Sequence, residues 1–155
     1  MKVYLHKEIF MIVTFCGHSD FKDNGSYTQI MLDFLEKTVG DCSAEMYLGG
    51  YGGFDAFACK CCKKYKENHS DISLIFVSPY VISERQKNLY SSYDHIVYPG
   101  IENIPPKFAI LHRNRYMVEK ADCVIAYITH SWGGAYSTYE YARRKGKMIF
   151  NLAEL

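Results

Sequence analysis

The 155-residue sequence lacks the apolar run of about 18 residues that a membrane span requires, and it has neither a basic block nor an acidic tail. Its formal net charge is only +1, whereas binding to a phosphate backbone needs a concentrated basic face. Lys2, Lys7 and Glu8 interrupt the N-terminus and exclude the apolar segment of a signal peptide. From these absences we expect a cytoplasmic protein with no membrane partner and no nucleic-acid partner.

The six cysteines lack the spacing of a zinc site. Three of them, Cys59, Cys61 and Cys62, lie on one expected helix, where neighbouring side chains point in different directions. His69 is the only further candidate ligand nearby, which is too few for a tetrahedral site. The sequence therefore predicts no metal, no disulfide and no cofactor.

Apolar runs that are rich in β-branched residues alternate with helix-like segments along the chain. The expected strands cover residues 10–16, 44–48, 72–77, 95–98, 123–128 and 147–152, and the main helices end near residues 39, 68, 120 and 145. Strands that are apolar on both faces and alternate with helices are typical of a parallel sheet covered on both sides. We predict an α/β fold, a doubly wound and mostly parallel sheet, in one domain spanning 1–155. Residues 1–10 are expected to form an N-terminal extension or an extra strand.

Glycines and polar residues follow four of the expected strands. Because the carboxyl ends of parallel strands lie at one edge of a sheet, these loops should line one crevice. Backbone N–H groups and the positive end of a helix dipole make two of the glycine turns attractive to phosphate. The expected ligand-binding residues are Gly17, His18, Ser19, Gly49, Gly50, Tyr51, Gly52, Gly53, Asp55, Pro79, Arg113, Trp132, Gly133, Gly134, Ala135, Ser137 and Thr138.

The glycine pattern is not one of the common nucleotide motifs. No G-x-G-x-x-G follows the first strand, and no Gly-Lys-Ser/Thr is present, which excludes the usual dinucleotide fingerprint and the P-loop. Four glycines between positions 49 and 53 still exceed what a tight turn needs, which favours close approach of a ligand. The alternative for Gly133 and Gly134 is a plain tight turn, and the alternative for Asp55 is a helix cap.

A family resemblance is carried by the string from Leu111 to Asp122, LHRNRYMVEKAD, by the strand after it and by the Gly133-Gly134 turn. In order and spacing these elements resemble the SLOG superfamily over about residues 11–152. That group includes the Lonely-guy phosphoribohydrolases, the Smf/DprA proteins and a small uncharacterised bacterial or phage branch. The resemblance implies a Rossmann-like fold that binds nucleotides or nucleotide-derived signals.

The resemblance also implies a catalytic pair, if the protein is an enzyme. The hydrolase branch uses an arginine before the glycine turn and a glutamate after it, and Arg113 and Glu140 match these positions. The turn departs from the hydrolase pattern, because Tyr136 replaces its third glycine and Trp132 and its neighbours replace its proline. This departure favours a protein that binds its ligand without cleaving it.

Two functions are left open by the sequence. In the first, the protein is a sensor or a sequestering protein for a small nucleotide ligand, of the cyclic or ADP-ribose type. In the second, it is a nucleoside-monophosphate N-glycosidase or a deoxyribosyltransferase-like enzyme. The count of 14 tyrosines indicates exposed aromatic surface, so we expect a homo-oligomer, either a dimer or a tetramer.

The sequence also allows more than one role for several individual side chains. Arg113 is expected to bind phosphate, and its alternative is an exposed arginine in a salt bridge. His18 is expected to bond a phosphate or a ribose hydroxyl, and its alternative is a hydrogen bond to the local backbone. Trp132, Tyr136 and Tyr51 are expected either to stack on a base or to form an oligomer contact.

Overall fold

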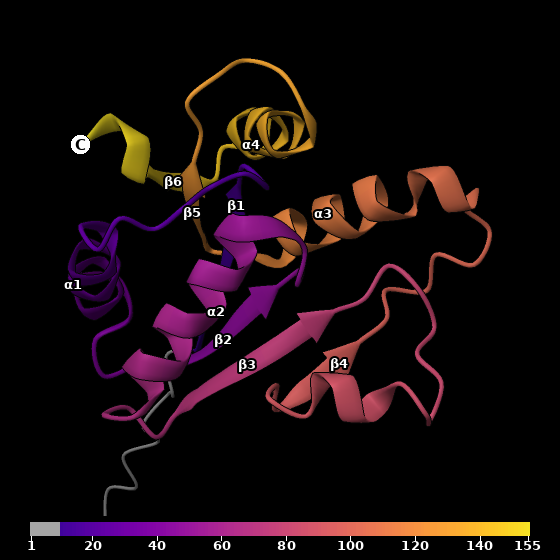
Figure 1. Cartoon of the computed structure of the whole chain (residues 1–155), viewed down its shortest axis with the longest axis horizontal. Coiled ribbons are helices and arrows are strands. Elements are labelled where there is room, and N and C mark those ends of the chain that lie inside the picture. The colour runs from indigo at the N-terminus through magenta and orange to yellow at the C-terminus, as the bar shows by residue number, and fades with distance from the viewer. Residues whose placement is uncertain (1–9) are drawn as a thin grey trace, which may run out of the picture.

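The computed structural model of the chain describes residues 10–155, and the expectation for residues 1–10 lies outside them apart from Phe10. Six strands form one sheet in the order β4-β3-β2-β1-β5-β6, and every pairing is parallel. The strands are β1 (Phe10–Gly17), β2 (Ser43–Leu48), β3 (Ile72–Val77), β4 (His95–Val97), β5 (Cys123–Tyr127) and β6 (Met148–Asn151). Figure 1 shows the arrows of β2, β3 and β4 pointing the same way.

Helices cover both faces of this sheet (Figure 1). One core packs α1 (Tyr27–Val39) and α2 (Gly52–Lys66) on one face, and two smaller clusters pack α3 (Ala109–Lys120) and α4 (Gly134–Arg144) on the other. Three short 3₁₀ helices complete the chain, η1 (Lys87–Tyr90), η2 (Pro106–Phe108) and η3 (Leu152–Glu154). The predicted doubly wound α/β fold is confirmed, and its sheet is wholly parallel in the part of the chain that the structure describes.

Apolar periodicity explains why these segments become buried helices and strands. Met31, Leu35 and Val39 recur every four residues on α1 and are all buried, as expected for one face of an amphipathic helix. The central strands are buried on both faces, which accounts for their nearly continuous apolar sequence. The polar segment 83–93, by contrast, has no apolar stripe and forms only η1.

The strand order has a switch point between β1 and β5. From β1 the chain winds through β2 and β3 to β4 at one edge, and it then returns to β5 on the other side of β1. Loops that leave β1 and β5 therefore separate to opposite faces and open a crevice at the carboxyl edge.

Within residues 10–155, no helix combines the length and the apolar character needed to cross a bilayer.

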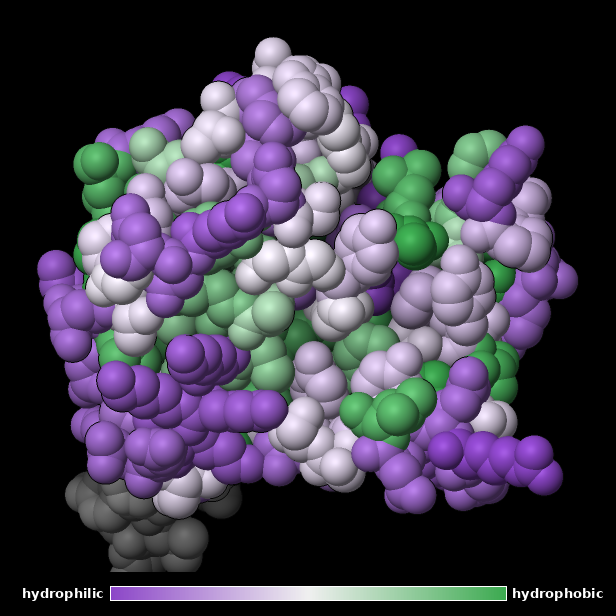
Figure 2. All heavy atoms as spheres, viewed as in Figure 1, coloured by the Kyte–Doolittle hydropathy of each residue, from purple (hydrophilic) through white to green (hydrophobic). Residues whose placement is uncertain are grey.

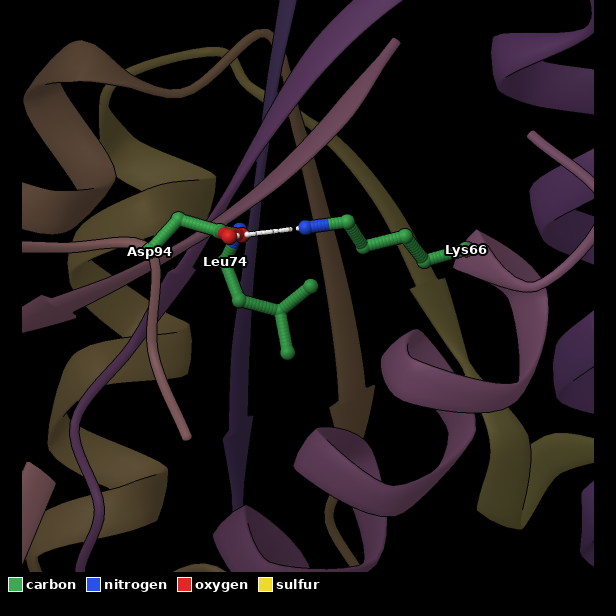
Figure 3. Close-up of polar contacts among 3 residues, drawn as sticks. All are labelled: Lys66, Leu74 and Asp94. Carbon is green, nitrogen blue, oxygen red and sulfur yellow. Dashed lines mark hydrogen bonds and ion pairs between the residues drawn. The ribbon is translucent and has the colours of Figure 1, made fainter. Parts of the chain in front are cut away.

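Asp94 ties α2 to the edge of the sheet (Figure 3). Its carboxylate accepts hydrogen bonds from Lys66 Nζ at 2.7 and 2.8 Å and from the backbone N–H of Leu74 at 2.7 Å. Burial acts to raise the pKa of Asp94, but the bonds from Lys66 and Leu74 outweigh burial, so the pKa lies below its ordinary value. This contact holds the segment before β4 against α2.

Replacing Asp94 with Asn should lower the melting temperature. The variant loses the ion pair with Lys66 and keeps at most a neutral acceptor for Leu74. Because both charged side chains are about one-third exposed, we expect a loss of about 1 kcal/mol in the free energy of unfolding. Denaturant unfolding measures it, and Glu84→Gln, which removes an exposed ion pair with Lys87, is the control that should change little.

Candidate functional site

A cavity of about 310 Å³ lies at the switch point between β1 and β5. Its walls come from the end of β1, the start of α2, the inner face of α3 and the loop that leads into α4. The structure brings eleven of the predicted residues into its lining: Gly17, His18, Ser19, Tyr51, Asp55, Arg113, Trp132, Gly133, Gly134, Ala135 and Thr138.

Seven predicted site residues lie outside this lining: Gly49, Gly50, Gly52, Gly53, Pro79, Ser137 and Glu140. The glycines after β2 are needed for packing within the protein. A Cβ at Gly53 would lie 2.2 Å from the carbonyl oxygen of Phe21, and one at Gly52 would lie 2.7 Å from Cα of Ser19. We expected this loop to be rich in glycine because a ligand approaches it. At Gly52 and Gly53, close packing within the protein gives the reason instead. Pro79 follows β3, which β2 separates from β1.

Glu140 faces away from the cavity. It lies two residues after Thr138, which lines the cavity, and two helical positions are about 200° apart. Its carboxylate instead pairs with Arg143 Nη1 at 2.8 Å on the outer side of α4. Ser137 is exposed one position before Thr138. The glutamate that the family resemblance offered as a catalytic group is thus outside the cavity.

The start of α4 is open to the cavity. Gly133 precedes the helix with a φ of 92°, a left-handed conformation that favours glycine. Gly134, the first helical residue, has no unusual φ, and a Cβ added to it would meet no atom within 4 Å. No backbone or packing reason requires glycine at Gly134, and its bare backbone leaves the helix N-terminus accessible. Thr138 supports this turn by donating to the Gly134 carbonyl at 3.0 Å.

Arg113 is held at the bottom of the cavity. Its side chain is only 3% exposed, so the alternative of a solvated surface arginine is wrong. Nη1 donates to the carbonyl oxygens of Gly49 and Val77, both at 2.9 Å, and Nε donates to Asn114 Oδ1 at 2.9 Å. Burial lowers the pKa of Arg113 below its ordinary value, and the neighbouring Asp55 opposes that shift.

Asp55 lines the cavity beside Arg113. Its Oδ2 accepts a hydrogen bond from the Tyr51 N–H at 3.0 Å, which is a cap for α2. Burial raises the pKa of Asp55 to about 6, although the Tyr51 N–H and the charge of Arg113 act to lower it. A Cβ at Gly49 would lie 3.1 Å from Arg113 Cζ and 3.2 Å from Asp55 Oδ2, so glycine there makes room for both groups.

Three rings form a stack along one wall. His18 and His130 are nearly parallel with centroids 3.7 Å apart, and His130 and Trp132 have centroids 3.8 Å apart. His18 Nε2 accepts from the N–H of Thr129 at 2.9 Å, so the neutral ring carries its proton on Nδ1. Burial, and then the neighbouring His130, lower the pKa of His18, which favours this neutral form. Trp132 closes the stack with a side chain that is 69% exposed.

Several lining residues were not among the predicted ones. They are Phe15, Cys16, Asp20, Ile110, Asn114, Met117 and His130. The helical spacing of Ile110, Arg113, Asn114 and Met117 places them on one face of α3, a signal that was available in the sequence. For His130 the sequence signal was only its place in a loop expected to line the crevice, because its exact position depends on the stack with His18, a residue from a distant part of the chain.

Comparison with protein-family models and with curated proteins finds no match for this sequence. Solved structures do match it. DNA processing protein A (DprA) from Streptococcus pneumoniae is 20% identical with a TM-score of 0.62, over 92% of this chain and 50% of that chain. The molybdenum cofactor carrier protein from Chlamydomonas reinhardtii is 15% identical with a TM-score of 0.57, over 94% of this chain and 77% of that chain.

DprA from Helicobacter pylori is also similar, with 17% identity and a TM-score of 0.60 over 91% of this chain and 64% of that chain. This chain therefore spans about half to two thirds of the DprA structures that it matches. At such low identity these matches concern the fold. They show that the protein has a Rossmann-like fold similar to that of DprA and of the molybdenum cofactor carrier protein.

The exclusion of nucleic acid as a partner needs correction. The H. pylori DprA structure is described as having a single-stranded DNA binding mode, so a protein with this fold does bind nucleic acid. The argument from a net charge of +1 failed because net charge averages over the whole surface. In the structure, Arg115 of α3 and three cations at the end of α4, Arg143, Arg144 and Lys145, gather around Tyr139 and Tyr141. Arg143 pairs with Glu140, so the average conceals a local group of three further cations.

The two glycine turns should respond in opposite ways to alanine. Gly53→Ala forces a Cβ against the Phe21 carbonyl and should lower the free energy of unfolding by about 1–3 kcal/mol. Gly134→Ala places its Cβ in open space at a helical position and should be neutral or stabilising by up to about 1 kcal/mol. Thermal or denaturant unfolding of both variants checks this, and equal losses would contradict it.

The raised pKa of Asp55 predicts a specific pH dependence. A carboxyl whose pKa is higher in the folded than in the unfolded protein contributes stability at low pH and loses it as the pH rises through the folded value, here about 6. The free energy of unfolding of Asp55→Asn, taken relative to that of the native protein, should therefore be lower at about pH 4.5 than at about pH 7.5. Melting temperatures of the two proteins across this range test the sign, and parallel curves would contradict it.

Proposed function

We propose that the protein binds a nucleotide or nucleotide-derived ligand in the cavity at the switch point, as a sensor or a sequestering protein, without breaking a bond in it. The observation that carries this proposal is Gly134, a glycine without a conformational or packing reason at the open N-terminus of α4. A ligand group that approaches the backbone there supplies the missing reason. Free N–H groups in the first turn of a helix suit phosphate.

The rest of the cavity fits the other parts of such a ligand. Trp132 and Tyr51 both line it and are 69% and 67% exposed, so each has a ring surface on which a base can stack. Arg113 supplies positive charge, and Asp55 supplies an acceptor for sugar hydroxyl groups. The molybdenum cofactor carrier proteins, which have this fold, are named for carrying a small ligand and so support a binding role.

Cleavage of an N-glycosidic bond is the second candidate, and Asp55 is the observation that favours it. A carboxyl with a pKa of about 6 inside a cavity has the character of a general base or acid. Against this, Glu140 is turned away and paired with Arg143, so the carboxylate that the resemblance implied is not available. A bound ligand therefore meets Asp55 and Asp20 as the carboxylates of the lining.

Nucleotide binding should raise the melting temperature of the protein and change its tryptophan fluorescence. Trp132 is the only tryptophan, so the fluorescence signal reports directly on this cavity. A panel of nucleoside monophosphates, cyclic nucleotides, ADP-ribose and a short single-stranded oligonucleotide should contain at least one compound that shifts both signals. Gly134→Ala should weaken that binding about tenfold, while the melting temperature of the ligand-free variant stays at or above the native value.

Two outcomes of this experiment decide between the candidates. If no phosphate compound shifts either signal, the binding proposal is wrong. If a compound binds, chromatography of the denatured complex distinguishes binding from chemistry, since an intact ligand supports sequestration and free base supports cleavage. Asp55→Asn is the matched variant. If Asp55 acts as the general base, this variant should no longer release base. If the protein only binds, the ligand should be recovered intact from both the variant and the native protein.

A further inference from the structure

A second cavity, of about 450 Å³, adjoins the first one across the start of α2. The two share the side chain of Asp55. Tyr51 lines the first cavity, while Gly50 and Gly52 on either side of it line the second. The loop after β2 therefore forms a narrow divide with a cavity on each side.

The second cavity is lined by unpaired cations. Lys60 and Lys63 project from α2 into its lining, and neither forms an ion pair with any residue from 10 to 155. Lys66, one turn further along, is different because Asp94 neutralises it. Figure 2 shows hydrophilic side chains gathered over the C-terminal end of α2, at the lower left of this face. Apart from the shared Asp55, the cavity has no acidic residue in its lining within residues 10–155.

The opposite wall of this cavity is aromatic and held in place. Tyr90 stacks on Phe76 with ring centroids 4.3 Å apart, and Tyr93 lies at 5.3 Å from the same ring. The bond between Asp94 and Lys66 fixes the segment that carries these tyrosines against α2 (Figure 3). Free lysines on one side and fixed aromatic rings on the other make a compartment that suits an anionic, partly planar group.

The size and charge of the two cavities limit the kind of ligand that would fit both of them. The first cavity alone is near the lower end of the range for small-molecule sites, roughly 300–1,000 Å³, and suits one nucleotide moiety. Phosphate is favoured at the open start of α4 in the first cavity and at the lysines in the second. Between them, Asp55 repels phosphate but accepts from hydroxyl groups.

We propose that the natural ligand carries two separate phosphate groups joined through a sugar, with the second phosphate bound by Lys60 and Lys63. This inference rests on the proposed function of the first cavity and narrows its ligand class. A nucleoside 3′,5′-bisphosphate has this arrangement, and so does a 5′-phosphorylated dinucleotide. A nucleoside 5′-monophosphate leaves the second cavity empty.

The test compares ligands that differ by the second phosphate. Titrations of AMP, GMP, the 3′,5′-bisphosphates of adenosine and guanosine, and the dinucleotides pApA and pGpG are followed by Trp132 fluorescence. The better two-phosphate ligand should bind at least about tenfold more tightly than its monophosphate, and the double variant Lys60→Glu/Lys63→Glu should remove this advantage. Affinity for the monophosphate should change by less than about twofold in the variant, because the first cavity is untouched. Comparison of the bisphosphates with the dinucleotides shows whether the second phosphate belongs to a single nucleotide or to a dinucleotide.

Lys64→Glu is the matched control, because Lys64 is exposed on the same helix but is not part of either lining. It should keep the advantage of the two-phosphate ligand. If monophosphates bind but the second phosphate adds nothing, or if its contribution survives in the double variant, this inference is wrong while the proposed function stands. If none of the six nucleotides binds, the inference is overturned as well. The melting temperatures of all variants confirm that the exposed substitutions leave the fold intact.

Discussion

The guanidinium of Arg113 connects the carboxyl ends of two strands and at the same time forms the bottom of the cavity. Nη1 donates to the carbonyl of Gly49, the residue after β2, and to the carbonyl of Val77, the last residue of β3. A buried cation has a high desolvation cost, so it persists only where acceptors and a nearby carboxylate compensate for it. Here Asn114 and Asp55 complete that compensation. The position of α3 relative to β2 and β3 and the absence of a side chain at Gly49 both depend on this buried charge.

The sequence was sufficient for the fold because the fold depends on periodicity. Apolar strands such as Ile72–Val77 and the four-residue repeat of Met31, Leu35 and Val39 can be recognised without knowledge of distant contacts. The candidate site depends more on such contacts. Arg113 was predicted as a ligand residue from the family resemblance, yet its bonds to two strand ends and its burial come from packing that no local pattern encodes. His130 was missed for the same reason, because its ring is positioned by His18 from the end of β1.

The two glycine turns show why composition alone misleads. Gly49 to Gly53 is the denser run and was the stronger signal, but Gly50, Gly52 and Gly53 pack closely against Phe76, Ser19 and Phe21. Gly49 makes room for Arg113 and Asp55. Gly133 and Gly134 were the weaker signal, and they are the pair with open space around them. Glycine enrichment reports either a left-handed backbone, as at Gly133, or something that lies close to the backbone. Whether that is another part of the protein or a ligand depends on tertiary structure, and the space around each missing Cβ distinguishes the two.

The ring stack gives the open glycine turn a defined position. Thr129, at the beginning of the loop to α4, donates its N–H to His18 Nε2, and that bond requires the neutral imidazole. His130 then lies flat between His18 and Trp132, so Thr129 and His130 fix the loop to the residue that follows β1. A loop anchored in this way presents the first turn of α4 to the cavity before any ligand arrives. A ligand that binds at Gly134, as we propose, would then not have to order the backbone, a cost that flexible glycine turns normally impose on affinity.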